Sequence, residues 1–172
     1  MKQIVRNRYL KEFKFSSADE LSVFMGNQVA KLCLSIDDTF GYKYYCYICY
    51  HSLTKEKEFI LSFSSDENED NFSLLFWNSE FILNTGKKIY LIDERLKIKK
   101  SIEITTPLIG MYLINSEKLL LLEEAYMRIV DCHGQVLRRE LFDLIEDFSI
   151  ENDLLFVQTS EENIVIDLNA IN

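Results

Sequence analysis

Cysteine and histidine are the residues of this chain whose spacing could support metal binding or nucleophilic catalysis. Cys46 and Cys49 form a CxxC pair with His51 two residues later, and Cys132 is followed directly by His133. Such sets can ligate zinc, and a cysteine beside a histidine can act as an activated nucleophile. Cys46 and Cys49 stand in an alternating aromatic run, however, and residues three apart on a strand point to opposite faces. We therefore predict no metal site, no cofactor and no catalytic residue.

His133 lies in the segment Asp131-Cys132-His133-Gly134, between two apolar runs. A short polar segment that ends in glycine is typical of a tight turn between strands. The turn accounts for this histidine without chemistry, so the sequence favours a protein that is not an enzyme. The alternative is an enzyme with an unfamiliar site, which would need His51 or His133 to lie in a pocket with other ionisable groups.

The N-terminal sequence predicts neither a secretory signal nor a membrane anchor. Charges recur every few positions in residues 1–14, and no apolar run reaches the roughly 20 residues of a membrane span. We therefore expect a cytoplasmic protein. Its four cysteines, Cys33, Cys46, Cys49 and Cys132, are expected to be reduced, because a chain of this size does not need disulfides to fold.

The composition predicts one folded domain over residues 1–172. Apolar residues make up 48% of the chain and charged residues 27%, which are values of globular proteins. A single proline and five glycines leave little material for a flexible linker. Within this domain the pattern of residues distinguishes a helix-containing part at 1–79 from a repetitive part at 80–172.

A single helix is predicted near the N-terminus. Ser17 and Glu20 have the spacing of a capping box, in which each side chain accepts a hydrogen bond from the other residue's backbone N–H. The pattern predicts a helix over about residues 18–30 with one face on the core. Its apolar residues recur at helical spacing: Leu21, Phe24, Met25 and Val29.

Alternating apolar residues predict strands through the rest of the chain. One strand is predicted before the helix, at residues 9–15. Aromatic and β-branched residues, which are typical of strands, dominate the segments that follow the helix. The strands predicted there are 32–36, 42–50, 59–63 and 72–77.

From residue 80 onward, short apolar runs that end in aspartate repeat. The aspartates are Asp93, Asp131 and Asp167, with spacings of 38 and 36 residues. An apolar run and a polar turn precede each of these runs, which predicts three hairpins. Two more strands are predicted after each of the first two hairpins, so that a complete unit has four strands. These additional strands are 96–104, 109–114, 136–142 and 144–150.

A unit of four short antiparallel strands resembles a blade of a β-propeller. The resemblance covers residues 80–172 and implies a mainly β fold, an antiparallel meander of blade-like repeats with one N-terminal helix. The chain has material for about three blades, whereas propellers usually close with four or more. The expected arrangement is therefore open, propeller-like or sandwich-like. Its free edges would be covered by the helix and first strands, or by a second copy of the chain.

Negative charge is concentrated near the C-terminus. Residues 140–172 hold nine acids and no Lys, Arg or His, which equals the net charge of −9, whereas residues 1–139 hold 19 acids and all 19 basic residues. Such a field repels nucleic acid and attracts basic proteins, although acids also serve simply to solvate a surface. The acids predicted to face a partner are Glu140, Asp143, Glu146, Asp147, Glu151, Asp153, Glu161 and Glu162, followed by Asp66, Glu67, Glu69 and Asp70 of a polar loop.

A small acidic chain without a catalytic motif is similar in type to the bacterial immunity proteins that neutralise toxins. The similarity implies a non-enzymatic antitoxin that occludes the basic substrate cleft of a nuclease-type toxin, with fast electrostatic association. The alternative is a structural or assembly module whose β edges pair with another copy, as a homo-oligomer. Neither nucleic acid nor a membrane is expected as a direct partner.

Overall fold

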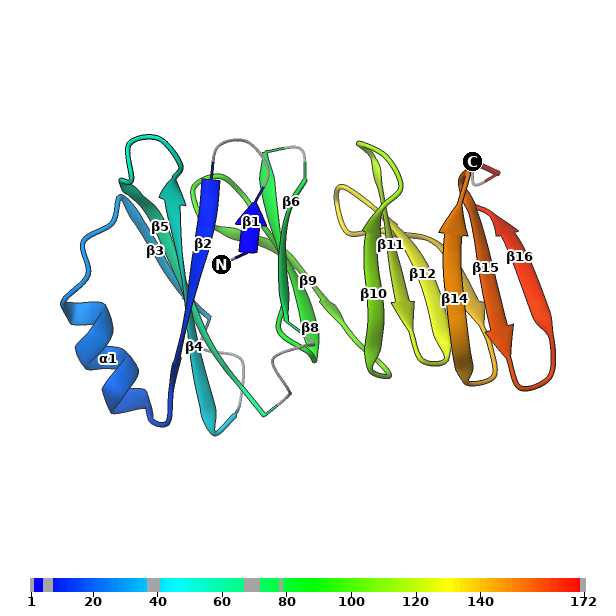
Figure 1. Cartoon of the computed structure of the whole chain (residues 1–172), viewed down its shortest axis with the longest axis horizontal. Helices are drawn as coiled ribbons and strands as arrows, with labels where there is room; N and C mark the ends of the chain where they lie inside the picture. Colours follow the sequence, from blue (N-terminus) through cyan, green and yellow to red (C-terminus); the bar gives the residue numbers. More distant parts are fainter. Residues whose placement is uncertain (1, 5–7, 37–40, 67–71, 78, 171–172) are drawn as a thin grey trace.

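The computed structural model describes residues 2–4, 8–36, 41–66, 72–77 and 79–170, most of which lie in strands (Figure 1). The first sheet, sheet A, has the strand order β1-β2-β4-β5-β3. Its strands are β1 (Lys2–Ile4), β2 (Arg8–Phe15), β3 (Leu32–Ile36), β4 (Lys43–His51) and β5 (Lys57–Ser65). Helix α1 (Ala18–Gly26) connects β2 to β3. Among the described residues, no helix has the length and apolar character needed to cross a membrane.

Three antiparallel sheets follow in chain order along the long axis of the molecule (Figure 1). Sheet B contains β6 (Ser73–Trp77), β7 (Glu80–Asn84), β8 (Lys88–Ile92) and β9 (Ile98–Glu103). Sheet C contains β10 (Leu108–Leu113), β11 (Lys118–Glu123), β12 (Tyr126–Asp131) and β13 (Val136–Leu141). Sheet D contains β14 (Ile145–Glu151), β15 (Leu154–Thr159) and β16 (Asn163–Asp167).

Each pair of neighbouring sheets shares a hydrophobic layer. Leu83 of β7 faces sheet A, whereas the preceding residue, Ile82, packs with Leu121 of sheet C. In the same way Leu120 packs with Leu155 of sheet D. Successive residues of a strand point to opposite faces, so β7 and β11 each contribute to two layers. The sheets are therefore stacked in the order A, B, C, D.

The predicted mainly β fold with one N-terminal helix is confirmed, but the strands are grouped differently. The strands predicted at 109–114 and 144–150 do not end their units, because as β10 and β14 they begin sheets C and D. The repetitive part also starts earlier, since β6 precedes residue 80 and belongs to sheet B. Pro107, the single proline of the chain, stands where the chain leaves sheet B for sheet C, and proline disfavours continued strand pairing.

Sheet A departs from a pure antiparallel meander. Strand β3 pairs in parallel with β5, while β4 lies between β2 and β5. The five consecutive residues 45–49 of β4 are all buried, and a strand that is buried on both faces belongs in the middle of a sheet. The chain therefore reaches the far edge of the sheet with β3 before it returns through the centre with β4.

Helix α1 begins as predicted and ends earlier than predicted. The Ser17 hydroxyl accepts a hydrogen bond from the Glu20 N–H at 3.2 Å, but the Glu20 carboxylate accepts from the N–H and hydroxyl of Ser16 rather than from Ser17. At the other end, the Asn27 side-chain amide donates to the Val23 carbonyl and satisfies one of the orphan acceptors of the last turn. Val29 consequently lies outside the helix with 86% of its surface exposed, so its place in the predicted apolar stripe was wrong.

Candidate functional site

The two ends of the sheet stack differ in what covers them. At the N-terminal end, Leu21, Phe24 and Met25 of α1 pack on the outer face of sheet A, over Cys46 and Ile48. At the C-terminal end, sheet D follows sheet C in the stack, and no described element lies beyond it (Figure 1). We call this outer face of sheet D, with the outer edge of β16, the open end.

Two apolar residues at the centre of the open end are more exposed than their equivalents in the other sheets. Val165 pairs with Phe156, as Leu91 pairs with Ile82 in sheet B. Leu91 is 1% exposed and Ile82 is fully buried, because sheet C covers them, whereas Val165 is 57% exposed. Phe156 is half-buried and lines a hollow of about 210 Å³ together with Val165, Asp147 and Gln158. The open end therefore presents the apolar layer that a further sheet would otherwise cover.

Acidic side chains surround this apolar centre. Of the predicted partner residues, Glu146, Asp147 and Glu151 lie on β14. The others close to sheet D lie in the segments that connect strands: Asp143 before β14, Asp153 before β15, and Glu161 and Glu162 after β15. All seven are exposed. Glu140 belongs to β13 of sheet C, where it forms an ion pair with Arg138 at 2.7 Å. The structure thus brings most of the C-terminal acids together around one sheet.

The second predicted group of acids lies elsewhere. Asp66 follows β5 of sheet A and accepts a hydrogen bond from the Tyr42 N–H at 2.7 Å. Sheets B and C separate sheet A from the open end. Glu67, Glu69 and Asp70 lie outside the described residues. Whether any of these acids contacts a partner stays a prediction.

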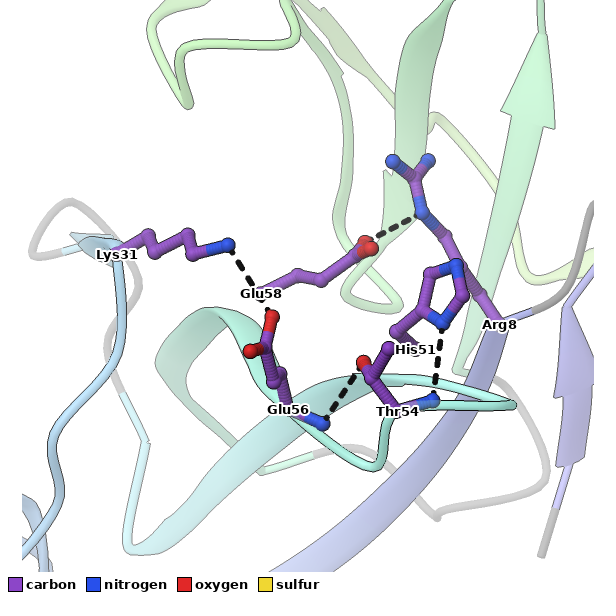
Figure 2. Close-up of polar contacts among 6 residues, drawn as sticks. All are labelled: Arg8, Lys31, His51, Thr54, Glu56 and Glu58. Carbon is purple, nitrogen blue, oxygen red and sulfur yellow. Dashed lines mark hydrogen bonds and ion pairs between the residues drawn. The ribbon is translucent and has the colours of Figure 1, made fainter.

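A second candidate region is a cleft of about 520 Å³ between sheets A and B. Figure 2 shows the hydrogen bonds and ion pairs made by four of its polar residues, Arg8, Lys31, His51 and Glu58. The Arg8 guanidinium binds the Glu58 carboxylate with an Nε to Oε2 distance of 2.5 Å, and its carbon lies 5.4 Å from the Phe76 ring centroid. Lys31, at the rim, forms a 3.4 Å ion pair with Glu56. Both cations are therefore already neutralised by acids of the same region.

His51 lines this cleft, and so does Ser79. The imidazole Nδ1 of His51 accepts a hydrogen bond from the Thr54 N–H at 3.3 Å (Figure 2). The neutral ring therefore carries its proton on Nε2. In this tautomer Nε2 is a donor and cannot take a proton from a serine hydroxyl, so the geometry does not provide the base of a serine-type site.

Two of the four cysteines, Cys46 and Cys49, are also poorly suited to act as nucleophiles. Cys46 and Cys49 point to opposite faces of β4, as predicted, and both are completely buried. Burial raises the pKa of each thiol to about 12, so both stay protonated near neutral pH, where a nucleophile has to be a thiolate. His133 is exposed in the predicted tight turn, in which Gly134 has a φ of +73°. Within the described residues, no three His, Cys, Asp or Glu side chains form a cluster suited to a metal ion.

Neither a protein-family model nor a curated protein matches this chain. Solved structures do match its fold. BamB from Moraxella catarrhalis is similar over 83% of this chain and 50% of its own, with a TM-score of 0.55 and 10% identity. BBS1N, solved in complex with ARL6DN, is similar over 76% of this chain and 48% of its own, with a TM-score of 0.52 and 7% identity.

Both structures are propeller-type folds, so the predicted resemblance to propeller blades is confirmed at the level of fold. This chain spans about half the length of the structures it matches. The similarity in type to immunity proteins finds no support in these comparisons and rests on the general character of the sequence alone.

Sequence reasoning found the acids of the open end but missed its apolar centre. Phe156 and Val165 stand in the same repeat positions as buried residues of sheets B and C, so their types alone mark them as core. Their exposure depends on whether another sheet covers them, which the residue type does not encode.

Proposed function

We propose that this chain is a non-enzymatic protein-binding module whose open end receives a basic protein. The observation that carries the proposal is the combination of an uncovered apolar centre at Phe156 and Val165 with a surrounding border of acids. Interfaces commonly pair an apolar centre, which supplies the free energy of binding, with a charged rim, which sets the association rate and the choice of partner.

The sign of the charge defines the class of partner. Residues 140–172 contain nine acids and no basic residue, so any cation that neutralises them has to come from another part of the molecule or from a partner. A second copy that docked its own open end here would bring two such acidic surfaces together, which is unfavourable. The repulsion argues against self-association through the open end, which the alternative of an assembly module would require here. It favours a basic partner that is not a copy of this chain.

Among basic proteins, a nuclease-type bacterial toxin is the partner class that we place first. The substrate cleft of a nuclease holds a polyanion, and an acidic surface with an apolar centre would occupy such a cleft in place of the phosphate backbone. The chain would then act as an immunity protein. The test of this finer assignment is whether the chain inhibits the nuclease activity of a captured partner.

The cleft between sheets A and B gives further support to a binding module over an enzyme. His51 of this cleft presents a donor at Nε2. Arg8 and Glu58 form an ion pair with each other in the same cleft. These three side chains are therefore already engaged, which favours a binding function.

The experiment compares two triple variants as baits with the wild-type chain. The first carries Glu151→Lys, Glu161→Lys and Glu162→Lys at the open end. The control changes the net charge by the same amount on other exposed sites, with Glu12→Lys, Asp19→Lys and Glu117→Lys. A basic protein captured from the host lysate is purified, and its affinity for the three chains is measured by calorimetry at low and high salt.

We expect the open-end variant to bind at least about tenfold more weakly at low salt and the control to bind like the wild type. Added salt should weaken wild-type binding because the charges are exposed. It should therefore also reduce the difference in affinity between the wild type and the open-end variant. Equal losses in the two variants would show that only net charge matters, and that the open end is not the binding face.

A further inference from the structure

Asp93, Asp131 and Asp167 begin the same turn in three consecutive sheets. In each of the first two turns, the aspartate Oδ1 accepts hydrogen bonds from the backbone N–H groups two and four residues later, at 2.9 and 2.8 Å. The Asp167 Oδ1 accepts from the N–H of Asn169, two residues later, at 2.8 Å. The third turn therefore starts like the other two.

The strand that follows this turn is present in sheets B and C and missing from the described part of sheet D. After Asp93 the chain returns as β9 and pairs with β8, and after Asp131 it returns as β13 and pairs with β12. Strand β16 holds the position of β8 and β12 but pairs only with β15 among the described strands. Its outer edge is therefore the place where a fourth strand would add.

The backbone of β16 is oriented to accept such a strand. Thr159 donates to the Glu162 carbonyl at 3.0 Å, and Leu168 donates to the Asp153 carbonyl at 2.9 Å. Hydrogen-bonded positions alternate along an antiparallel pair, so every second residue between these bonds directs its N–H and C=O groups away from β15. The residues whose backbone groups point to the outer edge are Asn163, Val165 and Asp167.

The two strands that occupy the equivalent edge, β9 and β13, both place a basic residue opposite the position of Val165. Each strand contains two adjacent basic residues, Lys99-Lys100 in β9 and Arg138-Arg139 in β13. The two pairs are offset by one position, so that only Lys100 and Arg138 coincide. Lys100 lies opposite Leu91, and Arg138 lies opposite Ile129, the residues equivalent to Val165.

The charge around β16 favours the same kind of strand. Glu161 and Glu162 precede β16 and Asp167 ends it, and residues 140–172 have no basic side chain of their own. A second β16 pairing antiparallel at this edge would place acids next to acids, whereas two adjacent basic residues would be attracted. The chemistry of the edge thus selects a cationic strand.

We infer that the outer edge of β16 accepts an extended segment of another protein as the fourth strand of sheet D, and that this segment carries a basic residue opposite Val165. The inference rests on the proposed function and specifies how the basic partner is held. Main-chain hydrogen bonds to residues 163–167 give the affinity, and the acids select the basic residue.

The probe is a synthetic peptide with the sequence of residues 135–142, Gln-Val-Leu-Arg-Arg-Glu-Leu-Phe, labelled with a fluorophore. Its binding to the full chain is measured by fluorescence anisotropy. The control peptide has glutamate at both arginine positions. Two protein variants are compared, Val165→Pro, which removes the outward N–H, and Val165→Thr, which keeps the N–H and the β-branched shape. Proline is tolerated at a position whose N–H does not pair within the sheet, and thermal melting of each variant checks its fold.

The basic peptide should bind the wild type, and it should bind Val165→Pro about tenfold more weakly than Val165→Thr. Both variants change the valine side chain, but only Val165→Pro loses a main-chain hydrogen bond and disturbs its neighbour. The glutamate peptide should not bind. Equal binding of the basic peptide to Val165→Pro and Val165→Thr would overturn strand pairing, and so would absence of binding to the wild type.

The two proposals can fail separately. If the captured partner depends on Glu151, Glu161 and Glu162 but binds Val165→Pro like the wild type, the open end is the binding face and strand addition is wrong. If the partner is indifferent to the open-end acids while the basic peptide still requires the Val165 N–H, the edge accepts strands and the proposed function is wrong.

Discussion

The two ends of the stack show two ways of treating the outer face of a sheet. Sheet A covers its outer face with the chain's own helix, whose Phe24 ring packs 4.7 Å from Phe13 and 4.9 Å from Phe15 between ring centroids. Sheet D leaves the equivalent layer in solvent, and Val165 is 57% exposed there. The difference shows that a repeated sequence pattern fixes which residues form the layer, whereas the neighbouring element decides whether the layer is core or binding surface.

The largest expected effect comes from truncating one apolar residue at each end. Ile48 is completely buried beneath α1, so Ile48→Ala should lower the free energy of unfolding by about 2–5 kcal/mol. Val165→Ala should cost less than about 1 kcal/mol, because most of the side chain is already in water. Urea denaturation measures both. Similar losses at the two positions would mean that Val165 is covered in solution.

A smaller effect is expected when the sheet A end of the stack, which α1 covers, is made to resemble the open end. Phe24→Ala removes the ring that α1 places on sheet A and should cost about 1.5–3 kcal/mol. Val23, its neighbour in α1, is 67% exposed, so Val23→Ala should be neutral or slightly stabilising through the higher helix propensity of alanine. Thermal melting of the wild type and the two variants measures the loss of stability. Equal decreases in melting temperature for Phe24→Ala and Val23→Ala would indicate that α1 does not cover the sheet.

The smallest expected effect is the contribution of a single buried thiol of sheet A to the loss of stability between pH 9 and pH 10. Burial raises the pKa of Cys46 and Cys49 from 9.0 to about 12, so between these values the unfolded chain loses protons that the folded chain keeps. This contribution to stability is complete below pH 9 and falls as the pH rises toward 12, by roughly 1 kcal/mol per thiol for each pH unit. Residues 140–172 contain no cysteine, so no thiol of the open end contributes to this dependence of stability on pH.

Urea denaturation at pH 8, 9 and 10 measures this dependence, with Cys46→Ala as the control. The control should show a shallower loss of stability above pH 9 than the wild type. An unchanged slope would mean that the thiol ionises equally well in the folded chain.

Much of this fold could be predicted because its signals are local. Alternation of apolar residues marked the strands, and the repeated aspartates marked the turns, since Asp93 and Asp131 bond to the backbone of their own turn residues. The grouping of β10 and β14 into new sheets and the parallel position of β3 depend on pairing between distant segments, which alternation does not encode. The early end of α1 was visible in principle, because Gly26-Asn27 is a helix-ending signal.

The candidate site was predictable in its charge and not in its shape. The acids of residues 140–172 stand out by composition, but the apolar residues at their centre look like any other core position of the repeat. Conversely, the cleft that holds His51 joins β2, β4 and β5 of sheet A with β6 and β7 of sheet B, segments whose proximity follows only from the stacking of the sheets.

The most direct test of the open end is hydrogen exchange of single backbone amides, measured by NMR on the isolated chain. Ile129 of β12 and Val165 of β16 hold equivalent positions, and β13 pairs with the outer edge of β12. We predict strong protection of the Ile129 amide and fast exchange of the Val165 amide, with protection of Val165 appearing only when a basic partner or the residue 135–142 peptide is added. Protection of Val165 equal to that of Ile129 in the isolated chain would show that the edge is already occupied, and would contradict an open end.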